Sequence, residues 1–406
     1  MRDSIGTTAA GRDFAKKWPK HYKKVAPDPE KSQSLVEAFS WPVKAKQNLA
    51  RIVEALPADR HPVLLSNRRL SCTSNFSGVC SQTRAAMVLE AHKFGCQFAH
   101  LSFCEKTKQC QHRLVQDFPQ SCIFTDQLHL LQTEGHEAMQ KCKTFEESRG
   151  SFEKGIFIDM LAPVIFGEPA DLGFHCVSRR RAFTVLVDRS KGQFIADPNQ
   201  VYKALCHGLG DRHLSLEELV KLGSQAFLEK ELALTGKSLD EYPDNLLTEL
   251  EKEHKGAYEK ALDETRPGEA HSQQAYCLNQ NPECVSKMST DGVLPAYTKS
   301  DRMTWLRHEK RHLLAIEKFA SHSYGVNAEL ANLLGIPVFS VYQMPNPHPV
   351  VGNGQHLGVA ALVLAATLLS VELFQPPEKL EDPKKALGWT HTKKLRKERD
   401  EATELS

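Results

Sequence analysis

Short apolar runs alternate with amphipathic stretches over residues 63–188, and this alternation restricts the chain to few folds. The runs CQFAHLSF, SCIFT, GIFID and AFTVLVD are typical of buried strands. Stretches between them, such as SQTRAAMVLEAHKFG and TKQCQHRLVQDF, have the spacing of amphipathic helices. Strands that alternate with helices favour an α/β fold, with an open sheet of parallel strands and helices on both faces.

The sequence divides into five predicted segments. They are a basic flexible arm (1–45), the first part of the α/β core (46–188), an acidic helical insert (189–274), the second part of the core (275–374) and a charged tail (375–406). The arm is assigned because residues 1–32 hold eight Lys/Arg and four Asp/Glu without apolar periodicity. The insert is assigned because strand patterns disappear after about residue 210 and charged helical patterns replace them.

Composition sets limits on partners and compartment. The chain has 52 Lys+Arg and 50 Asp+Glu, a net charge of +2, so no global charge attracts nucleic acid or membranes. The chain has 11 cysteines, an odd number, and no C-x-x-C pattern, which favours reduced thiols in an intracellular protein. No apolar leader opens the sequence, and the run KKLRKER near its end slightly favours a nuclear over a cytoplasmic location.

One segment has the composition of a membrane span. The run Leu357–Phe374 is almost wholly apolar, but it is 18 residues long and contains Glu372. Crossing a bilayer core of roughly 30 Å takes about 20 residues. We therefore expect a buried core helix and no membrane contact.

Three features follow the first three predicted strands in order. A small-residue turn with Ser77 and Gly78 follows the first strand and lets a ligand approach the backbone closely. Glu105 follows the second strand, CQFAHLSF, where a carboxylate can accept ribose hydroxyls. Asp126 follows the third strand, SCIFT, where a carboxylate can accept an adenine amino group. No glycine-rich pyrophosphate repeat follows Gly78. The set predicts a nucleoside ligand without phosphates, such as S-adenosylmethionine.

These motifs resemble those of the cytosine-C5 DNA methyltransferases. Phe76, Ser77 and Gly78 match the family's opening F-S-G loop, whose Phe packs on the adenine. Glu105 and Asp126 match its ribose and adenine carboxylates.

The later motifs follow in the family's order. Arg179 and Arg181 match the arginines of its Q-x-R-x-R segment, with Val177 in place of the Gln. LPAYT and the following LLAIEKFASHSYGV resemble the ninth motif. In the same region RHEKRHLLAIEKFASH has the pattern of a helix and IPVFSVY that of a strand. The glycine loop of Gly352, Asn353 and Gly354, followed by the apolar run, resembles the tenth motif, which closes the methionine end of the cofactor pocket. The resemblance covers about 66–188 and 275–372 and implies a Rossmann-like, S-adenosylmethionine-dependent methyltransferase fold with an inserted helical lobe.

The resemblance implies methyl transfer to cytosine C5 in DNA. In the family a thiolate attacks C6 of a flipped cytosine and a Glu contacts N3. The family's P-C-Q and E-N-V strings are absent here. Cys142 is the nearest candidate nucleophile, Asp159 the candidate base-contacting acid, and Arg179 and Arg181 the candidates that orient the catalytic centre.

Several alternatives remain open. Residues 211–269 carry 15 acidic and 8 basic residues, a net charge of −7, where the family places its DNA-reading lobe, so DNA is the least supported partner. The insert could instead bind a protein. The chain could also be a catalytically inactive cofactor-binding or interaction module. HEKRH at His308–His312 matches the H-E-x-x-H pattern of zinc peptidases, although three cations surround it and we assign no metal ligands.

Overall fold

The computed structural model describes the greater part of the chain. The described residues are 31–56, 59–66, 69–75, 81–105, 107–118, 121–124, 163–187, 192–240, 242–243, 246–265, 271–283, 288–297 and 303–374. Six predicted site residues lie outside them: Phe76, Ser77, Gly78, Asp126, Cys142 and Asp159.

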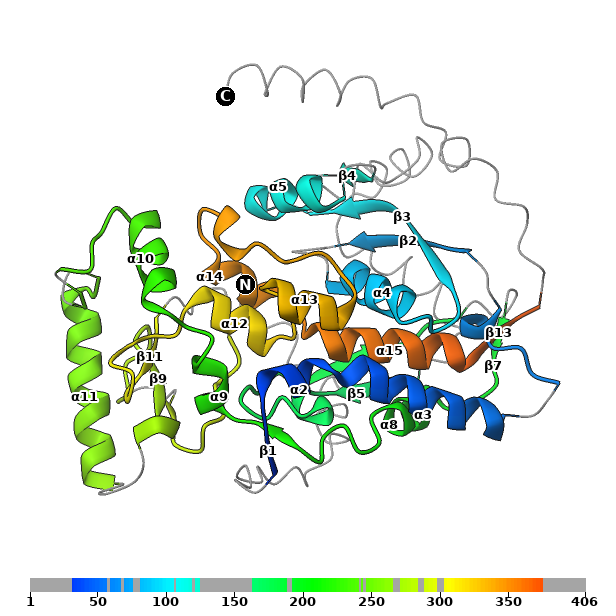
Figure 1. Ribbon diagram of the computed structural model, residues 1–406, viewed down its shortest axis with the longest axis horizontal. Helices are drawn as coiled ribbons and strands as arrows, with labels where there is room; N and C mark the ends of the chain where they lie inside the picture. The colour runs from blue at the N-terminus through cyan, green and yellow to red at the C-terminus, as the bar shows by residue number, and fades with distance from the viewer. Residues whose placement is uncertain are drawn as a thin grey trace, which may run out of the picture.

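A parallel sheet occupies the first part of the core (Figure 1). It has the order β2 (Arg69–Asn75), β3 (Gln97–Cys104) and β4 (Cys122–Phe124), and both strand pairs are parallel. The crossover helices are α4 (Ser81–Ala91) and α5 (Lys108–Asp117). The predicted succession of parallel strands and helices is confirmed for this part of the chain.

The apolar helix α15 (Leu357–Leu369) forms the centre of the core. His356 caps it by accepting the Val359 N–H, and its long side chains and alanines favour helix throughout. It packs against α4, as Figure 1 shows, and against α8 (Pro198–Leu205). The stretch His348–Leu369 is long and apolar enough to span a membrane, yet 76% of its apolar window is buried inside the protein. The predicted core helix is confirmed over 357–369, whereas residues 371–373, which were expected to continue it, form the strand β13 (Val371–Leu373).

Short strand pairs surround this helix. They are β13 (Val371–Leu373) with β7 (Gly192–Phe194), β5 (Val164–Gly167) with β6 (Arg181–Thr184), and β1 (Ser32–Gln33) with β8 (His213–Leu214). The pair β5–β6 is antiparallel, so AFTVLVD does not extend the parallel sheet as the alternation suggested. Among the described residues the fold is therefore mixed α/β, with several small sheets.

Residues 31–45 of the segment assigned to a flexible basic arm form regular structure. After β1 the chain forms α2 (Leu35–Phe39) and α3 (Trp41–Ala55). Ser34 and Glu37 form a capping box at the start of α2. Phe39 and Trp41 are buried against the core, and the Trp41 indole N–H donates to Ser323 Oγ. The predicted arm was extended to residue 45, past its Lys/Arg-rich part at 1–32, and so included these apolar anchors.

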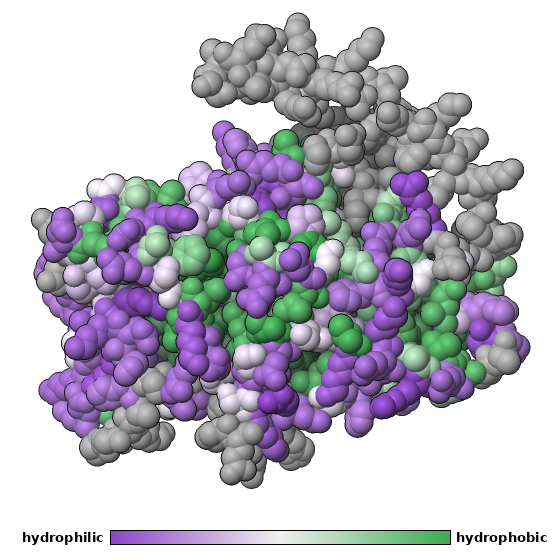
Figure 2. Space-filling view, in the orientation of Figure 1, coloured by the Kyte–Doolittle hydropathy of each residue, from purple (hydrophilic) through white to green (hydrophobic). Residues whose placement is uncertain are grey.

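Part of the acidic segment forms helices at one end of the molecule, α10 (Gln225–Leu234) and α11 (Glu249–Thr265) (Figure 1). The same segment also contains α9 (Leu216–Val220), which contacts α12 (Ala315–Ser321), and α8, which packs against α3 and α15 in the core. Beside α10 and α11 lies an antiparallel sheet with the order β10 (Met288–Ser289), β9 (Ala275–Cys277), β11 (Thr304–Leu306) and β12 (Arg311–His312). Hydrophilic residues gather over this end in Figure 2, whereas hydrophobic residues show in the middle of the same face. We call α10 and α11 the helical lobe.

The helix expected over RHEKRHLLAIEKFASH is only partly present. Residues 307–310 form the turn between β11 and β12, with Lys310 at φ 50°, and helix begins with α12 (Ala315–Ser321). His308 and His312 therefore do not share one face of a helix. The zinc peptidase interpretation of HEKRH is wrong, because the His side chains must lie one helical turn apart for that site.

The expected strand IPVFSVY is also wrong. Residues 336–340 follow α13 (Ala328–Leu334) as extended chain without a strand partner and lead into the short 3₁₀ helix Val341–Gln343. Its apolar character comes from Phe339, which is fully buried beneath the guanidinium groups of Arg84 and Arg113. Helix α14 (His348–Asn353) then leads to α15. Side-chain burial alone thus produced the strand-like pattern. The remaining short 3₁₀ helices are Val63–Leu65, Pro169–Leu172 and His271–Gln273.

Candidate functional site

The predicted glycine loop lies against the first residue of α4. The Gln355 N–H, directly after Gly354, donates to Ser81 Oγ at 3.1 Å. Ser81 Oγ also hydrogen-bonds Tyr324 Oη at 2.7 Å, and both side chains are buried. Residues 76–80 immediately precede Ser81 in the chain. The fold therefore joins the glycine loop to the end of the predicted cofactor loop.

Arg179 connects three segments that are distant in sequence. Its side chain is buried, and its terminal nitrogens donate to the Tyr297 carbonyl at 3.1 Å and the Gly352 carbonyl at 2.7 Å. Backbone hydrogen bonds between Leu294 and residues 176 and 178 hold the first two segments in register. Burial, followed by the charge of Arg181, lowers the pKa of Arg179 to about 10, so the guanidinium stays charged at neutral pH.

Two buried histidines lie beside Arg179. The rings of His322 and His356 are 6.4 Å apart between centroids, and both side chains are almost completely inaccessible. Burial, followed by the charge of Arg179, lowers the pKa of His356 to about 3 and that of His322 well below its usual value. Both rings are therefore neutral at pH 7. We call Arg179, Ser81, Tyr297, Tyr324, His322, His356 and the backbone of 352–355 the Arg179 junction.

The Arg179 junction contains buried polar atoms without partners among the described residues. They are Nε of Arg179, both ring nitrogens of His322 and Nε2 of His356. Leaving such an atom unpaired costs about 1–3 kcal/mol. Buried donors and acceptors in proteins are normally satisfied by protein, ordered water or a ligand. The junction is thus suited to hold polar groups from outside the chain.

Glu105 lies where the sequence placed it, at the end of β3. The residue is 7% exposed, and its Oε1 accepts the Thr107 N–H at 2.7 Å. This bond satisfies a donor at the N-terminus of α5, which is the ordinary role of an acid at a strand end. The same position also leaves the carboxylate at the carboxyl edge of the parallel sheet, where α/β folds bind ligands.

The structure brings together only part of the predicted site. It joins Arg179 to Gly352 and sets Gly354 one residue before the contact with Ser81. Asn353 ends α14 between these glycines. Arg181 is exposed at the start of β6. Within the described residues, its Nη1 donates to the carbonyl of the neighbouring Arg180. Arg179 thus positions loops through its terminal nitrogens, and the catalytic roles of both arginines stay predictions.

Sequence reasoning missed the other members of the Arg179 junction. Ser81 directly follows the predicted cofactor loop, and His322 and Tyr324 lie in the SHSYG run after the ninth-motif helix. His356 directly precedes an apolar helix, and its sequence position gave no indication of a site. A serine that starts a helix and a histidine inside an apolar segment are the only signals that the sequence offers.

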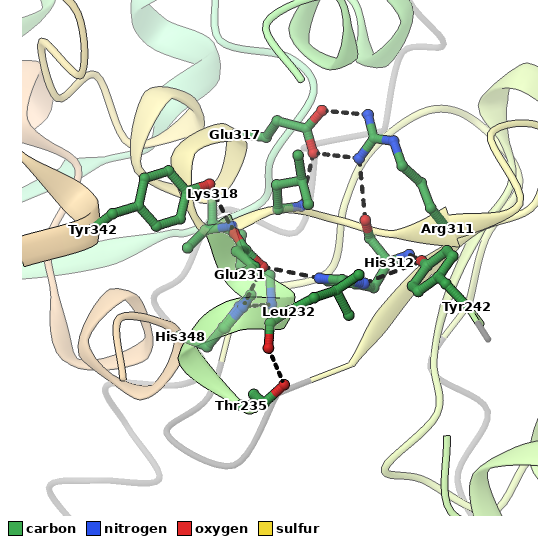
Figure 3. A network of polar contacts seen from close by, with 12 residues as sticks. Glu231, Leu232, Thr235, Tyr242, Arg311, His312, Glu317, Lys318, Tyr342 and His348 are labelled. Atoms are coloured by element: carbon green, nitrogen blue, oxygen red, sulfur yellow. Dashed lines mark hydrogen bonds and ion pairs between the residues drawn. The ribbon is translucent and has the colours of Figure 1, made fainter. Parts of the chain in front are cut away.

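A second polar cluster lies between the helical lobe and the core. Its centre is Glu231 on α10, which is 6% exposed. Figure 3 shows the imidazoles of His312 and His348 approaching this carboxylate, and each Nε2 lies 2.9 Å from Oε2. Oε1 accepts the Tyr342 O–H at 3.0 Å and the Ala315 N–H. The carboxylate therefore has four donors, two on each oxygen.

Both histidines are held from their far sides as well. The Tyr242 hydroxyl lies 3.2 Å from His312 Nδ1, and the Lys318 ammonium lies 3.1 Å from His348 Nδ1. Because an ammonium only donates, Nδ1 of His348 accepts and its Nε2 carries the proton that faces Glu231. Burial, followed by the charge of Lys318, lowers the pKa of His348 to about 4. Burial alone would raise the pKa of Glu231, but the contacts with His348 and His312 lower it below its usual range. We call these seven residues the Glu231 network.

The Glu231 network opens onto a cavity of about 380 Å³. The lobe and the core both line this cavity, with Glu231, Leu232, Leu234, Thr235, Lys237 and Leu246 on one side and Met303, His312, Pro345, Asn346, Pro347 and His348 on the other. Small molecules and ions can therefore reach the two imidazoles from this side.

Comparisons with known proteins give little further identification. No family model matches this chain. No curated protein matches it either. Among solved structures, the chain is similar to an E. coli prophage-encoded protein that carries the name of a DNA modification methyltransferase. The match has 13% identity and a TM-score of 0.42, and it covers 73% of this chain and 98% of that one. A likeness of this size is too slight to assign fold or function.

Proposed function

We propose that the protein is an S-adenosylmethionine-dependent methyltransferase, divergent from the cytosine-C5 DNA methyltransferases. One observation carries the proposal: segments that match separate motifs of that family meet in space. Ser81, next to the opening loop, contacts the glycine loop, and Arg179 binds that loop and the LPAYT segment. Residues that only served separate surface roles would have no reason to meet in this way.

The surrounding fold supports a nucleoside site at the same place. The strands β2, β3 and β4 run parallel, so their carboxyl ends lie at one edge of the sheet. Glu105 ends the middle strand of the three and is buried there. Ligands of open α/β sheets bind at this edge. The opening loop and Asp126 follow β2 and β4 in the sequence and lie outside the described residues.

The described residues fit an adenosine with a charged methionine arm. Glu105 would accept the ribose hydroxyls, and the glycine loop and Ser81 would bound the methionine end. The unpaired polar atoms of the Arg179 junction are of the kind that a ligand or its bound water satisfies. Bound there, the cofactor would supply an electrophilic methyl group, while the chain would position it and exclude water.

Methyl transfer to cytosine C5 in DNA is the finer part of the proposal. It rests on the resemblance alone, since Cys142 and Asp159 lie outside the described residues. Arg179 would act as a positioning residue for the two loops. The exposed Arg181 would be available to a phosphate, which planar guanidinium donors suit. A nuclear or cytoplasmic location would follow from this substrate.

A catalytically inactive cofactor-binding module is the second candidate. It is favoured by the missing P-C-Q and E-N-V strings and by the acidic lobe. This candidate shares the cofactor site but predicts no methyl transfer. The two are separated by activity and not by binding.

Calorimetric titration with S-adenosylhomocysteine tests the shared site. We expect wild-type binding and a loss of at least tenfold in affinity for Glu105→Gln, because a ribose hydroxyl loses a charged acceptor worth about 1.5–3 kcal/mol. Glu54→Gln, on the exposed face of α3, is the matched control and should bind like wild type. Absence of binding by folded wild-type protein would contradict both candidates.

Transfer of a tritiated methyl group to mixed-sequence DNA tests the reaction. An active enzyme should label DNA, and Cys142→Ser should abolish the label if Cys142 is the nucleophile. Equal labelling by both proteins would remove Cys142 from the mechanism. Cofactor binding without any label on DNA would favour the inactive module.

A further inference from the structure

We propose that Glu231, His312 and His348 form a binding site for Zn²⁺ that joins the helical lobe to the core. The three side chains each offer one ligand atom, and these atoms all lie within 4.8 Å of one another. Two imidazoles and one carboxylate are a ligand set that zinc accepts. This inference does not depend on the proposed methyltransferase function.

The distances need only a small adjustment. Each imidazole Nε2 lies 2.9 Å from Glu231 Oε2. Zinc–ligand bonds of about 2.0–2.2 Å in a tetrahedron place neighbouring ligand atoms about 3.3 Å apart. The two N–O distances would widen by a few tenths of an ångström, and the two Nε2 atoms, which lie within 4.8 Å of each other, would move closer to admit the ion. The Nε2 proton of each neutral imidazole would move to its Nδ1 by exchange with solvent, so that the Nε2 lone pair binds zinc. At His348 the new Nδ1–H would face the Lys318 ammonium, which would have to move aside.

The neighbouring residues already provide outer support for such a site. Glu231 Oε1 is fixed by the Tyr342 O–H and the Ala315 N–H, so Oε2 points toward the histidines. When His312 Nε2 binds a metal, its Nδ1 carries the proton and becomes a donor. The Tyr242 hydroxyl at this nitrogen can rotate so that its oxygen accepts the Nδ1–H hydrogen bond. Outer partners of this kind orient metal ligands and strengthen their binding.

Lys318 opposes the binding of a cation at His348. Its ammonium lies 3.1 Å from His348 Nδ1 and is buried. Like charges at this range repel, and burial reduces the screening. Lys318 therefore sets an upper limit on zinc affinity, and its replacement should strengthen binding. An ordinary hydrogen-bond network without a metal would show no such gain.

The cavity supplies an open coordination position. It reaches Glu231, His312 and His348 from the side of Asn346 and Thr235. Sites with three protein ligands and one open position exchange water or a small ligand at the metal. Since Glu231 lies on α10 and the histidines on β12 and α14, the ion would cross-link lobe and core.

Cobalt substitution and zinc titration test the site on the full chain. Co²⁺ should give the visible absorption of a four-coordinate complex, and one equivalent of Zn²⁺ should displace it. His312→Gln and His348→Gln should each weaken binding at least tenfold. His308→Gln and Glu309→Gln, on the exposed turn of the HEKRH sequence, are matched controls and should bind like wild type.

Lys318→Met keeps the test decisive if the histidine variants fail to fold. We expect this variant to bind zinc at least tenfold more tightly than wild type, with a larger rise in melting temperature on zinc addition. Absence of a four-coordinate cobalt spectrum in both wild type and Lys318→Met would overturn the proposal. So would equal loss of binding in His308→Gln and His312→Gln, because it would place the metal on the turn.

Discussion

The Arg179 junction and the Glu231 network are both buried and polar, yet they differ in how their atoms are satisfied. Around Glu231 each carboxylate oxygen has two donors, and the far nitrogens of both histidines have partners. Around Arg179, four polar atoms have no partner among the described residues. The two regions thus represent opposite solutions to the burial of polar groups.

This difference separates a region whose hydrogen bonds are complete without a ligand from one that needs further groups to complete them. A fully paired network specifies one arrangement of its elements, because removal of any member leaves others unsatisfied. A partly paired cluster is costly unless something else completes it. The Glu231 network therefore fixes the lobe against the core, whereas the Arg179 junction is preorganised for groups that come from elsewhere.

The largest expected effect is on stability, from Glu231→Leu. The substitution leaves two imidazole N–H groups, a phenol and a backbone N–H without an acceptor, so we expect a loss of about 3–5 kcal/mol in unfolding free energy. Urea unfolding measures it. Glu229→Leu, on the exposed side of the same helix, should change the value by less than about 0.5 kcal/mol. Similar values for the two variants would remove the distinction between paired and unpaired regions.

Arg179→Met should cost about 2–3 kcal/mol, because the Tyr297 and Gly352 carbonyls lose a charged donor inside the protein. It should also abolish binding of S-adenosylhomocysteine, since the glycine loop loses its anchor. Arg181→Met removes only a local bond to Arg180 and should leave stability within about 0.5 kcal/mol. An Arg179 variant that unfolds easily but binds the cofactor normally would make the junction purely structural.

Acid should destabilise the Arg179 junction through its histidines. The pKa of folded His356 is about 3 and its ordinary value is 6.5, so between these values the unfolded chain binds the proton and the folded chain does not. The contribution of His356 to stability is therefore fully present well above pH 6.5 and falls as pH decreases, by about 2 kcal/mol at pH 5. The lowered pKa of His322 acts in the same direction.

His356→Asn tests this contribution and keeps a side-chain cap for α15. Between pH 7 and pH 5, the unfolding free energy of the variant should fall by about 2 kcal/mol less than that of wild type, as measured by urea unfolding. The exposed His308→Asn should follow the wild-type curve. A wild-type curve that is flat in this range would show that the junction already accommodates imidazolium.

The smallest effect is expected from Ser81→Ala, at about 1 kcal/mol. The change removes hydrogen bonds to Tyr324 Oη and the Gln355 N–H. A double-mutant cycle with Tyr324→Phe should give a coupling energy of about 0.5–1 kcal/mol, because the two hydroxyls contact each other directly. Strictly additive losses would mean that this contact does not hold the glycine loop in place.

Local pattern was sufficient for much of the core. The periodicity predicted β3, α4, α5 and α15, since each has one clear apolar pattern and lies in an unbroken stretch. It failed for HEKRH, where a hairpin turn resembles a helical charge pattern, and for IPVFSVY, where Phe339 is buried by two arginines and not by a sheet. In both cases partners far along the chain decided the conformation.

Sequence reasoning could predict a residue of the candidate site only where that residue belonged to a motif. Arg179, Glu105 and the glycines were found in this way, but their roles were not. That Arg179 donates to two carbonyls 118 and 173 residues away cannot be read from its neighbours. Of the Glu231 network, the sequence singled out only His312, as part of HEKRH and with the wrong partners, because Glu231 lies among other acids of a charged helix.

The amino-acid sequence by itself determined where the chain turns apolar, which helices and strands form in the first core segment, and that α15 must be buried. Only the tertiary structure decided which buried polar groups meet, and whether each finds a partner. Hydrophobic periodicity is a local property, repeated every few residues, whereas hydrogen-bond satisfaction depends on groups that approach through space from distant segments.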